Sequence, residues 1–337
     1  MTRPWFGAWG SFERMRISRR SALDVSLLVL VNGMWAGQYA AYKVATEKLG
    51  PITVSAWTFL LAILVLLPFL IVERRRLRNS PALRPAPGHA PEGLNRSLWG
   101  KRNLLGFLMI GVAGLIPASA VLAWGIERST ASNAALIYLT MPIMTAVLAS
   151  LILHEKMSLV RWSSLVVSLT GVLILSDFSW RHLDVASSKF LVGNLLVLVA
   201  CACSSFYNVY CKELLRRFTP LEVLVYGYLL ALVISLPLLV WAEPLSLREV
   251  RDYGSAVWMA LAVLSVFSWG LAMVIWMFLL KRLDVSQASV SIYLLPFLGV
   301  LISAVTLGEK ITLTMVVGGA VTLAGTILIT SLEPTPT

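Results

Sequence analysis

Ten runs of apolar residues, each about as long as a membrane is thick, constrain this chain more than any other feature. A helix needs roughly 20 apolar residues to cross about 30 Å of hydrocarbon. Such runs lie at about 22–42, 52–72, 103–124, 131–153, 159–177, 190–210, 222–242, 256–279, 286–307 and 312–331. Hydrophobic residues make up 58% of the chain and charged residues 13%, which excludes an ordinary soluble protein. Because lipid offers no partner to an open strand edge, we expect an all-α integral membrane protein.

The sequence contains the same unit twice. A block at Met141–Ser158 aligns without a gap with a block at Leu295–Thr312. The shared residues of the extended match are Pro142 and Pro296, Glu155 and Glu309, Lys156 and Lys310, and Gly171 and Gly325. An earlier block in each half aligns Lys43 with Lys212 and Pro51 with Pro220. Each half therefore carries five of the ten predicted helices in the same order.

Five helices per repeat is an odd number, so the second repeat enters the membrane from the opposite side. The two copies are then inverted, an architecture in which a binding site lies between the repeats and opens to each side in turn. We expect a tail at 1–21, repeat 1 at 22–177, repeat 2 at 190–331 and a second tail at 332–337. Repeat 1 also contains a basic, Pro-rich loop at 73–102.

The net charge of +11 is explained by orientation in a membrane and does not require a nucleic acid partner. Sorted by alternate loops, about 20 Lys and Arg fall on the side of the N-terminus and about 8 on the other side. This bias places both termini in the cytoplasm of a multi-pass protein of the cell membrane. The cluster at 74–78 is read as an orientation signal, with binding of anionic lipids as the alternative.

Polar residues within the predicted helices point to a hydrated interior lined by equivalent helices of the two halves. The candidate substrate-binding residues are Trp35, Gln38, Tyr39, Tyr42, Lys43, Tyr138, Tyr207, Asn208, Trp269 and Tyr293. The alternative is that these side chains form hydrogen bonds between helices and contact no ligand. The three cysteines match no zinc signature, and the sequence predicts neither a metal site nor a cofactor.

Four further residues are candidates for gating. Pro142 and Pro296 each lie about halfway along a predicted helix, where a proline bends the axis and frees a carbonyl. Either a hinge or a static kink fits this position. Glu155 and Glu309 fall in tight turns between helices, where a carboxylate favours the dipole of the helix that follows. Ion coupling or gating is the alternative role for both.

The region from about 22 to 331 resembles the EamA family of the drug/metabolite transporter superfamily. The matching features are Trp35, Gly37 and Lys43 in the first helix, the mid-helix prolines, the glutamates of the following turns, and the later glycines. The resemblance implies a cavity lined by helices 1–4 and 6–9, with helices 5 and 10 outside it. Many members carry an Arg early in the second helix, where this chain has Ala56–Phe59.

Together these features predict a secondary transporter that uses no ATP and moves small metabolites by alternating access. Aromatic and amide side chains favour export of amino acids or similar amphipathic compounds. Anionic metabolites, including nucleotide or phosphorylated sugars, are the alternative substrates. A channel or a receptor-like binding protein is the alternative of another class. His89, His154 and His182 lie in three separate loops, so no catalytic cluster predicts an enzyme.

The partners predicted are therefore the lipid bilayer and a small-molecule substrate. Helices 5 and 10 carry stripes of small residues, which favour close packing of helices. These stripes are read as scaffold or as the surface of a homodimer. Their residues are Ser164, Ser168 and Gly171 in the first half and Gly318, Gly319 and Gly325 in the second.

Overall fold

The computed structural model describes residues 19–79, 100–129, 134, 137–175, 190–243, 250, 252–298 and 313–332. Across these ranges the chain is helical, without a strand. Most of the predicted loop, nearly all of both predicted tails, and the turn with Glu309 and Lys310 lie outside the described residues. Within the described ranges, five helices are long and apolar enough to cross a membrane, and shorter apolar helices accompany them.

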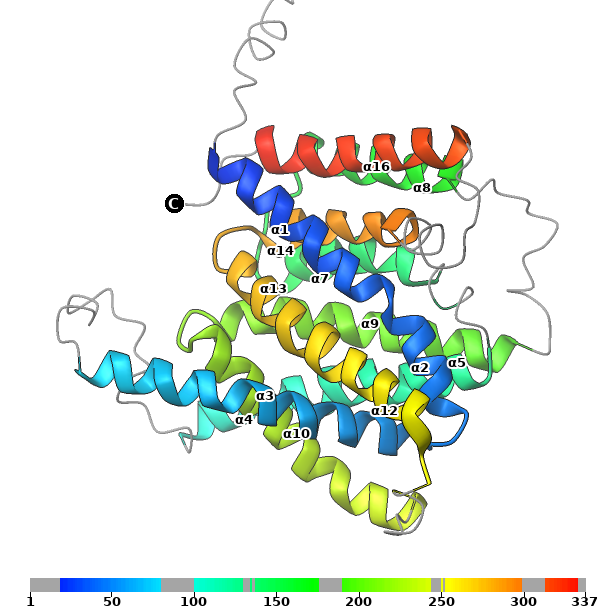
Figure 1. Ribbon diagram of the computed structural model, residues 1–337. Helices are drawn as coiled ribbons and strands as arrows, with labels where there is room; N and C mark the ends of the chain where they lie inside the picture. Colours follow the sequence, from blue (N-terminus) through cyan, green and yellow to red (C-terminus); the bar gives the residue numbers. More distant parts are fainter. Residues whose placement is uncertain are drawn as a thin grey trace, which may run out of the picture.

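The first half begins with a predicted helix that is divided at Gly37, and its second helix runs beyond the predicted end to Asn79. The helical segments of this half are α1 (Arg19–Ala36), α2 (Gln38–Thr46), α3 (Pro51–Asn79), α4 (Lys101–Met109), η4 (Ile110–Leu115), η5 (Pro117–Val121), α5 (Leu122–Glu127), η6 (Tyr138–Thr140), α7 (Met141–Ile152) and α8 (Leu159–Leu175). Segments α4 to α5 form one continuous membrane span (Figure 1).

The second half repeats this order. Its helical segments are α9 (Leu191–Leu214), α10 (Pro220–Ala242), α12 (Gly254–Ala262), η9 (Val263–Ala272), α13 (Met273–Leu280), α14 (Val285–Ser289), η10 (Val290–Tyr293) and α16 (Leu313–Leu332). Segments α12 to α13 form one span, and α14 and η10 belong to a helix that continues to Leu298. Counting these composite spans, the described residues contain the ten helices that the sequence predicts.

The two ends of the helical bundle are distinguished by the chain termini. The termini end, on the left of Figure 1, is where α1 begins and α16 ends. Helices α3, α7, α9 and α13 also end there, and α8, α10 and α14 begin there. The far end is the opposite side, where α2 and α5 end. Large apolar side chains such as Leu64, Phe69 and Trp241 are exposed on the outer surface of the bundle, as lipid contact requires.

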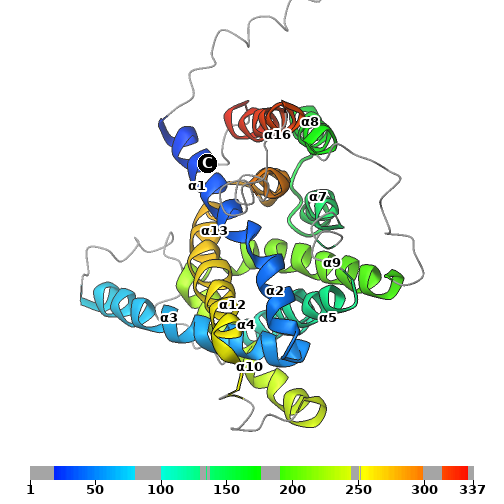
Figure 2. The same ribbon diagram turned by 45° about the vertical axis from the view of Figure 1, so that its right-hand side comes forward.

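Helices α8 and α16 lie side by side at the edge of the bundle, apart from the central helix α9 (Figure 2). They pack through the small-residue stripes, and Ser168 and Thr322, which are equivalent in the repeat, each donate a hydroxyl to the other's carbonyl at 3.3 and 3.4 Å. A Cβ added at Gly171 or Gly325 would lie within 2.5 Å of atoms of the opposite helix. The two stripes thus pack within one chain, and a homodimer would have to form through another face.

Candidate functional site

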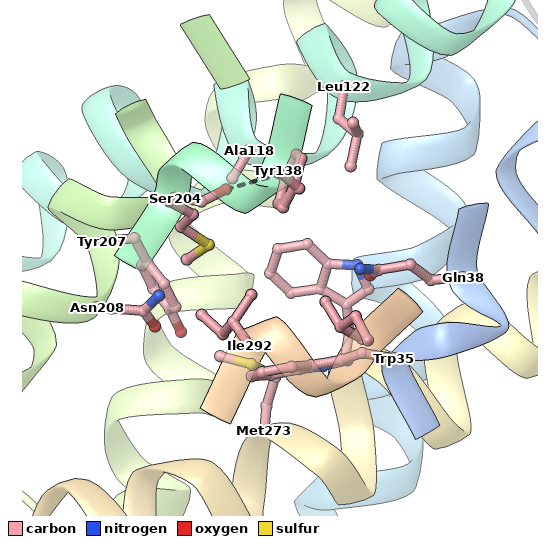
Figure 3. Close-up of a pocket in the computed structure, with 13 residues that line it drawn as sticks. Trp35, Gln38, Ala118, Leu122, Tyr138, Ser204, Tyr207, Asn208, Met273 and Ile292 are labelled. Carbon is pink, nitrogen blue, oxygen red and sulfur yellow. Dashed lines mark hydrogen bonds between the residues drawn. The ribbon is translucent and has the colours of Figure 1, made fainter. Parts of the chain in front are cut away.

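A pocket lies between the two halves of the chain, and the space not filled by protein atoms within it is about 540 Å³ when the open solvent at its mouth is included. Most of its wall is aromatic or aliphatic, and a few uncharged polar groups interrupt it (Figure 3). Its lining consists of Trp35, Gln38, Ala118, Leu122, Tyr138, Met141, Ser204, Tyr207, Asn208, Trp269, Met273, Ile292 and Leu295. None of these described lining residues carries a net charge at neutral pH.

Equivalent positions of the two repeats meet in this lining. Four pairs contribute both members, namely Trp35 with Ser204, Gln38 with Tyr207, Tyr138 with Ile292, and Met141 with Leu295. The paired residues come from α1, α2 and α9 and from the two helices that contain Pro142 and Pro296. The pocket therefore lies close to the pseudo-twofold axis that relates the two repeats, where an inverted-repeat protein places its binding site.

The two prolines shape the wall of the pocket. Proline lacks an amide N–H, so Pro142 cannot donate to the carbonyl of Tyr138, and Pro296 cannot donate to that of Ile292. In each helix the turn before the proline is wound as a tighter 3₁₀ segment, η6 in the first half and η10 in the second. Both residues whose carbonyls lose the proline donor line the pocket, and these carbonyls accept instead from the N–H groups of Met141 and Leu294. The break and the pocket thus coincide in both repeats.

Two equivalent helices beside the pocket are wound more loosely, as π-helix. These stretches are η4 and η5 in the first half and η9 in the second. In the first half, Pro117 removes one backbone donor. In the second, the Ser265 hydroxyl donates to the Leu261 carbonyl at 2.6 Å and competes with the ordinary backbone bond. Loose winding of this kind is frequent at functional sites.

The two tryptophans of the pocket have their indole N–H groups engaged elsewhere. Trp35 Nε1 donates to the backbone carbonyl of Ser268 at 3.2 Å, and Trp269 Nε1 donates to the Tyr42 hydroxyl at 3.0 Å. Both rings therefore contribute π surface to the pocket, while their indole N–H groups bond to other residues of the protein. Such surfaces suit aromatic, aliphatic or ammonium groups of a ligand.

Six of the ten predicted substrate-binding residues line this pocket, and four do not. The six are Trp35, Gln38, Tyr138, Tyr207, Asn208 and Trp269. Tyr39 packs edge-on against the Tyr138 ring at 5.6 Å, and Tyr42 lies behind Trp269 as its hydrogen-bond acceptor. Tyr293 is buried in a separate apolar cluster with residues of α8 and α16.

Lys43, the fourth of these residues, binds the end of a helix. Its ammonium donates to the carbonyls of Ile126 at 3.1 Å and Ser129 at 3.3 Å, at the C-terminal end of α5. Its repeat partner Lys212 donates in the same way to the carbonyl of Leu283, just beyond α13. A cation at a helix C-terminus is stabilised by the orphan carbonyls and the dipole. The two lysines therefore have backbone partners in place of a ligand.

Glu155 also binds a helix end, but in the other repeat. The sequence predicts an interaction with α8, the next helix in the chain. Instead its carboxylate accepts from the backbone N–H groups of Val285 at 2.9 Å and Ser286 at 3.1 Å, which begin α14. Arg161 lies 3.5 Å from Glu155 and also pairs with Asp284. This buried charge cluster joins the two halves at the termini end.

Other ion pairs lie at the same end. Arg74 of α3 pairs with Glu222 of α10 at 2.9 Å, and Arg282 approaches Asp24 of α1 at 3.6 Å. Burial lowers the pKa of Lys281, although the Glu73 and Glu222 carboxylates oppose the shift. At the far end, Glu243 accepts from the backbone N–H groups at the start of α3, at 3.1 and 2.7 Å. The described residues of the far end include no ion pair between side chains.

The lining residues that the prediction missed are mostly apolar. Single apolar residues carry no signal that separates a pocket wall from a packed core. Repeat equivalence does carry such a signal, because transfer of Trp35 and Tyr138 to the second half gives Ser204 and Ile292. The remaining missed residues are Ala118, Leu122, Met141, Met273 and Leu295.

Comparison with known proteins now decides the family. The profile of the EamA-like transporter family matches residues 23–177 and again residues 191–331. The chain belongs to the EamA-like transporter family. It is thus a multi-pass membrane transporter, of a family that is not enzymatic.

Two known proteins are similar to this chain over most of its length. A probable terminal-alkyne amino-acid exporter of Streptantibioticus cattleyicolor is 27% identical over 305 residues, covering 90% of this chain and 91% of that protein. The uncharacterized transporter YyaM of Bacillus subtilis is 24% identical over 311 residues, covering 90% and 92%. A crystal structure that is 15% identical covers 93% of this EamA chain and 98% of its own, with a TM-score of 0.66, and shows the same fold.

Proposed function

We propose that this EamA transporter exports amino acids or similar small amphipathic compounds across the cytoplasmic membrane by alternating access. The observation that carries the proposal is the aromatic pocket between the repeats, lined by equivalent residues of both. A pocket so placed can be exposed to either side by two related arrangements of the repeats. The amino-acid exporter among the relatives supports the substrate class and the direction.

The chemistry of the lining favours neutral or zwitterionic substrates over anionic ones. Anionic metabolites and phosphorylated sugars are the alternative that two membrane lysines suggest in the sequence. Both lysines bind backbone carbonyls at helix ends, and none of the described lining residues is cationic. A net anion would enter this pocket without a charged partner, which is costly in a low-dielectric site.

The orientation and the moving parts belong to the same proposal. The excess of Lys and Arg at the termini end favours a cytoplasmic location for that end. Pro142 and Pro296 are the proposed hinges, since each break adjoins the pocket. Glu155 is the proposed cytoplasmic gate residue, because it connects the two halves there. Glu309, its proposed counterpart, lies outside the described residues.

Counterflow in proteoliposomes tests this function. We expect uptake of labelled phenylalanine or leucine to saturate and to be accelerated by unlabelled substrate inside. Uptake that rises linearly with substrate concentration and is not accelerated by internal substrate would instead indicate a channel. Leu295→Trp fills the pocket and is expected to abolish counterflow, whereas Leu236→Trp, on the exposed face of α10, leaves it intact. Size-exclusion profiles would show that both variants are folded, since overpacking alone destabilises.

A further inference from the structure

Asn208 is a polar lining residue whose amide orientation is fixed by a hydrogen bond. The indole N–H of Trp276 donates to Asn208 Oδ1 at 2.9 Å. An indole nitrogen can only donate, so the amide must turn its oxygen toward Trp276. The opposite orientation would set two donors against each other and leave a buried N–H unpaired. The NH₂ group of Asn208 is therefore directed away from Trp276.

That NH₂ group belongs to the wall of the pocket. Asn208 lies beside Tyr207 on the side of the pocket opposite Trp35 and Gln38 (Figure 3). The indole donors of Trp35 and Trp269 are already engaged. The Asn208 amide thus presents up to two donors to a molecule in the pocket, and its own acceptor is occupied.

Trp276 holds this amide from outside the lining. It is fully buried in α13, and its ring packs edge-on against Trp35 at 5.2 Å. It therefore touches both sides of the site, by its N–H on Asn208 and by its ring on Trp35. Rotation of the Asn208 side chain would have to break the bond to this buried partner.

We propose that the Asn208 amide donates to an acceptor group of the substrate, the carboxylate in an amino acid, and that Trp276 is the positioning residue that holds the amide in this orientation. The inference rests on the proposed function and adds one polar contact to it. A neutral donor binds a carboxylate without burying a protein charge. The substrate ammonium is left to the aromatic surfaces on the opposite wall.

Replacement of the Asn208 NH₂ group by an oxygen converts the proposed hydrogen-bond donor into an acceptor. Asn208→Asp keeps the shape and the bond to Trp276 but replaces the donors with an anionic oxygen. We expect the apparent Kd for L-phenylalanine and for 3-phenylpropionate to rise about a hundredfold. Phenethylamine, which keeps the ring and amine without the carboxylate, should bind about threefold more tightly. A general loss of structure could not produce opposite changes.

The measurement is the ligand-dependent rise in Tm of the purified full-length protein, titrated with each of the three compounds. Trp276→Phe removes the N–H and is expected to weaken phenylalanine about threefold without weakening phenethylamine. Asn194→Asp makes the same atomic change elsewhere on α9, against Ser129, and should leave the ratio of the Kd values unchanged.

Two negative results can be told apart. A wild-type protein that binds phenylalanine, combined with Asn208→Asp weakening all three compounds equally or none of them, overturns the inference alone. A wild-type protein that shows neither a Tm response nor counterflow with any amino acid overturns the proposed amino-acid function, and the inference falls with it.

Discussion

Charged side chains hold the helices together at each end of this transporter, but their partners differ between the two ends. At the termini end, Arg161, Arg74 and Arg282 pair with carboxylates on other helices. At the far end, Lys43 and Glu243 bind backbone carbonyl and amide groups at helix ends. The cluster around Arg161 is almost fully shielded from solvent, with 8% of the Arg161 side chain and 6% of the Glu155 side chain exposed. Buried pairs of this kind are costly to separate.

The comparison separates contacts that occur in both repeats from contacts that occur in only one repeat. Lys43 and Lys212 are equivalent and bind equivalent helix ends. Two residues of the buried charge cluster instead correspond to uncharged ones, since Arg161 aligns with Met315 and Asp284 with Thr130. In alternating access, opening of the termini end would separate oppositely charged side chains. Opening of the far end would instead break hydrogen bonds that join no two charged groups, such as those of Lys43, Glu243 and Ser129. We therefore expect the described arrangement to be held chiefly at the termini end.

Removal of Arg161 should have the largest effect on this comparison. Arg161→Met introduces the residue found at the equivalent position and leaves the buried carboxylates of Glu155 and Asp284 without their guanidinium. We expect the free energy of unfolding in detergent to fall by about 3–5 kcal/mol. The matched control is Arg216→Met, because 64% of that side chain is exposed, and a loss of about 0.5 kcal/mol is expected. Equal losses would mean that the buried cluster contributes no more than a surface pair.

The two lysines should behave as a matched pair with an intermediate effect. Lys43→Met and Lys212→Met each remove donors to the end of one helix, so each should lower the free energy of unfolding by about 1 kcal/mol. The half-saturating concentration in counterflow should not change, because neither residue lines the pocket. An increase in that concentration for Lys43→Met alone would indicate that Lys43 contacts the substrate.

The smallest effect on the free energy of unfolding is expected at the backbone of His154. His154 precedes Glu155 and has a φ of 56°, in the left-handed region that suits glycine. The equivalent residue of the second copy is Gly308. His154→Gly should relieve the strain and raise the free energy of unfolding by about 0.5 kcal/mol, after the greater entropy of unfolded glycine is subtracted. Thermal unfolding measures this change, and a decrease would show that the His154 side chain itself stabilises the turn.

The helices and their number could be predicted from the sequence because lipid allows few alternatives. Apolar runs fix the spans, and the duplicated blocks fix the relation between the halves. The ends of the helices do not follow from the apolar runs, since α3 continues past its apolar residues and brings Arg74 to Glu222. Nothing in the local sequence indicates that such a pair forms across helices far apart in the chain.

The candidate site was predicted in part for a related reason. Polarity identifies which helices approach the pocket, but it does not give the rotation of each helix about its axis. Neighbouring residues on a helix differ by about 100° in direction, so Gln38 lines the pocket while Tyr39 packs beside it. A long side chain adds its own reach, which takes the Lys43 ammonium to the end of α5.

The loosely wound stretch η9 gives the second half a means of adjustment that a regular helix lacks. Conversion of one of its wide turns to ordinary winding would shift everything beyond it by one residue, about 1.5 Å along the axis and about 100° around it. Trp276 lies beyond that stretch, so a one-residue step in the backbone would carry its indole away from Asn208. The proposed contact between Asn208 and the substrate would then change together with the winding of the helix.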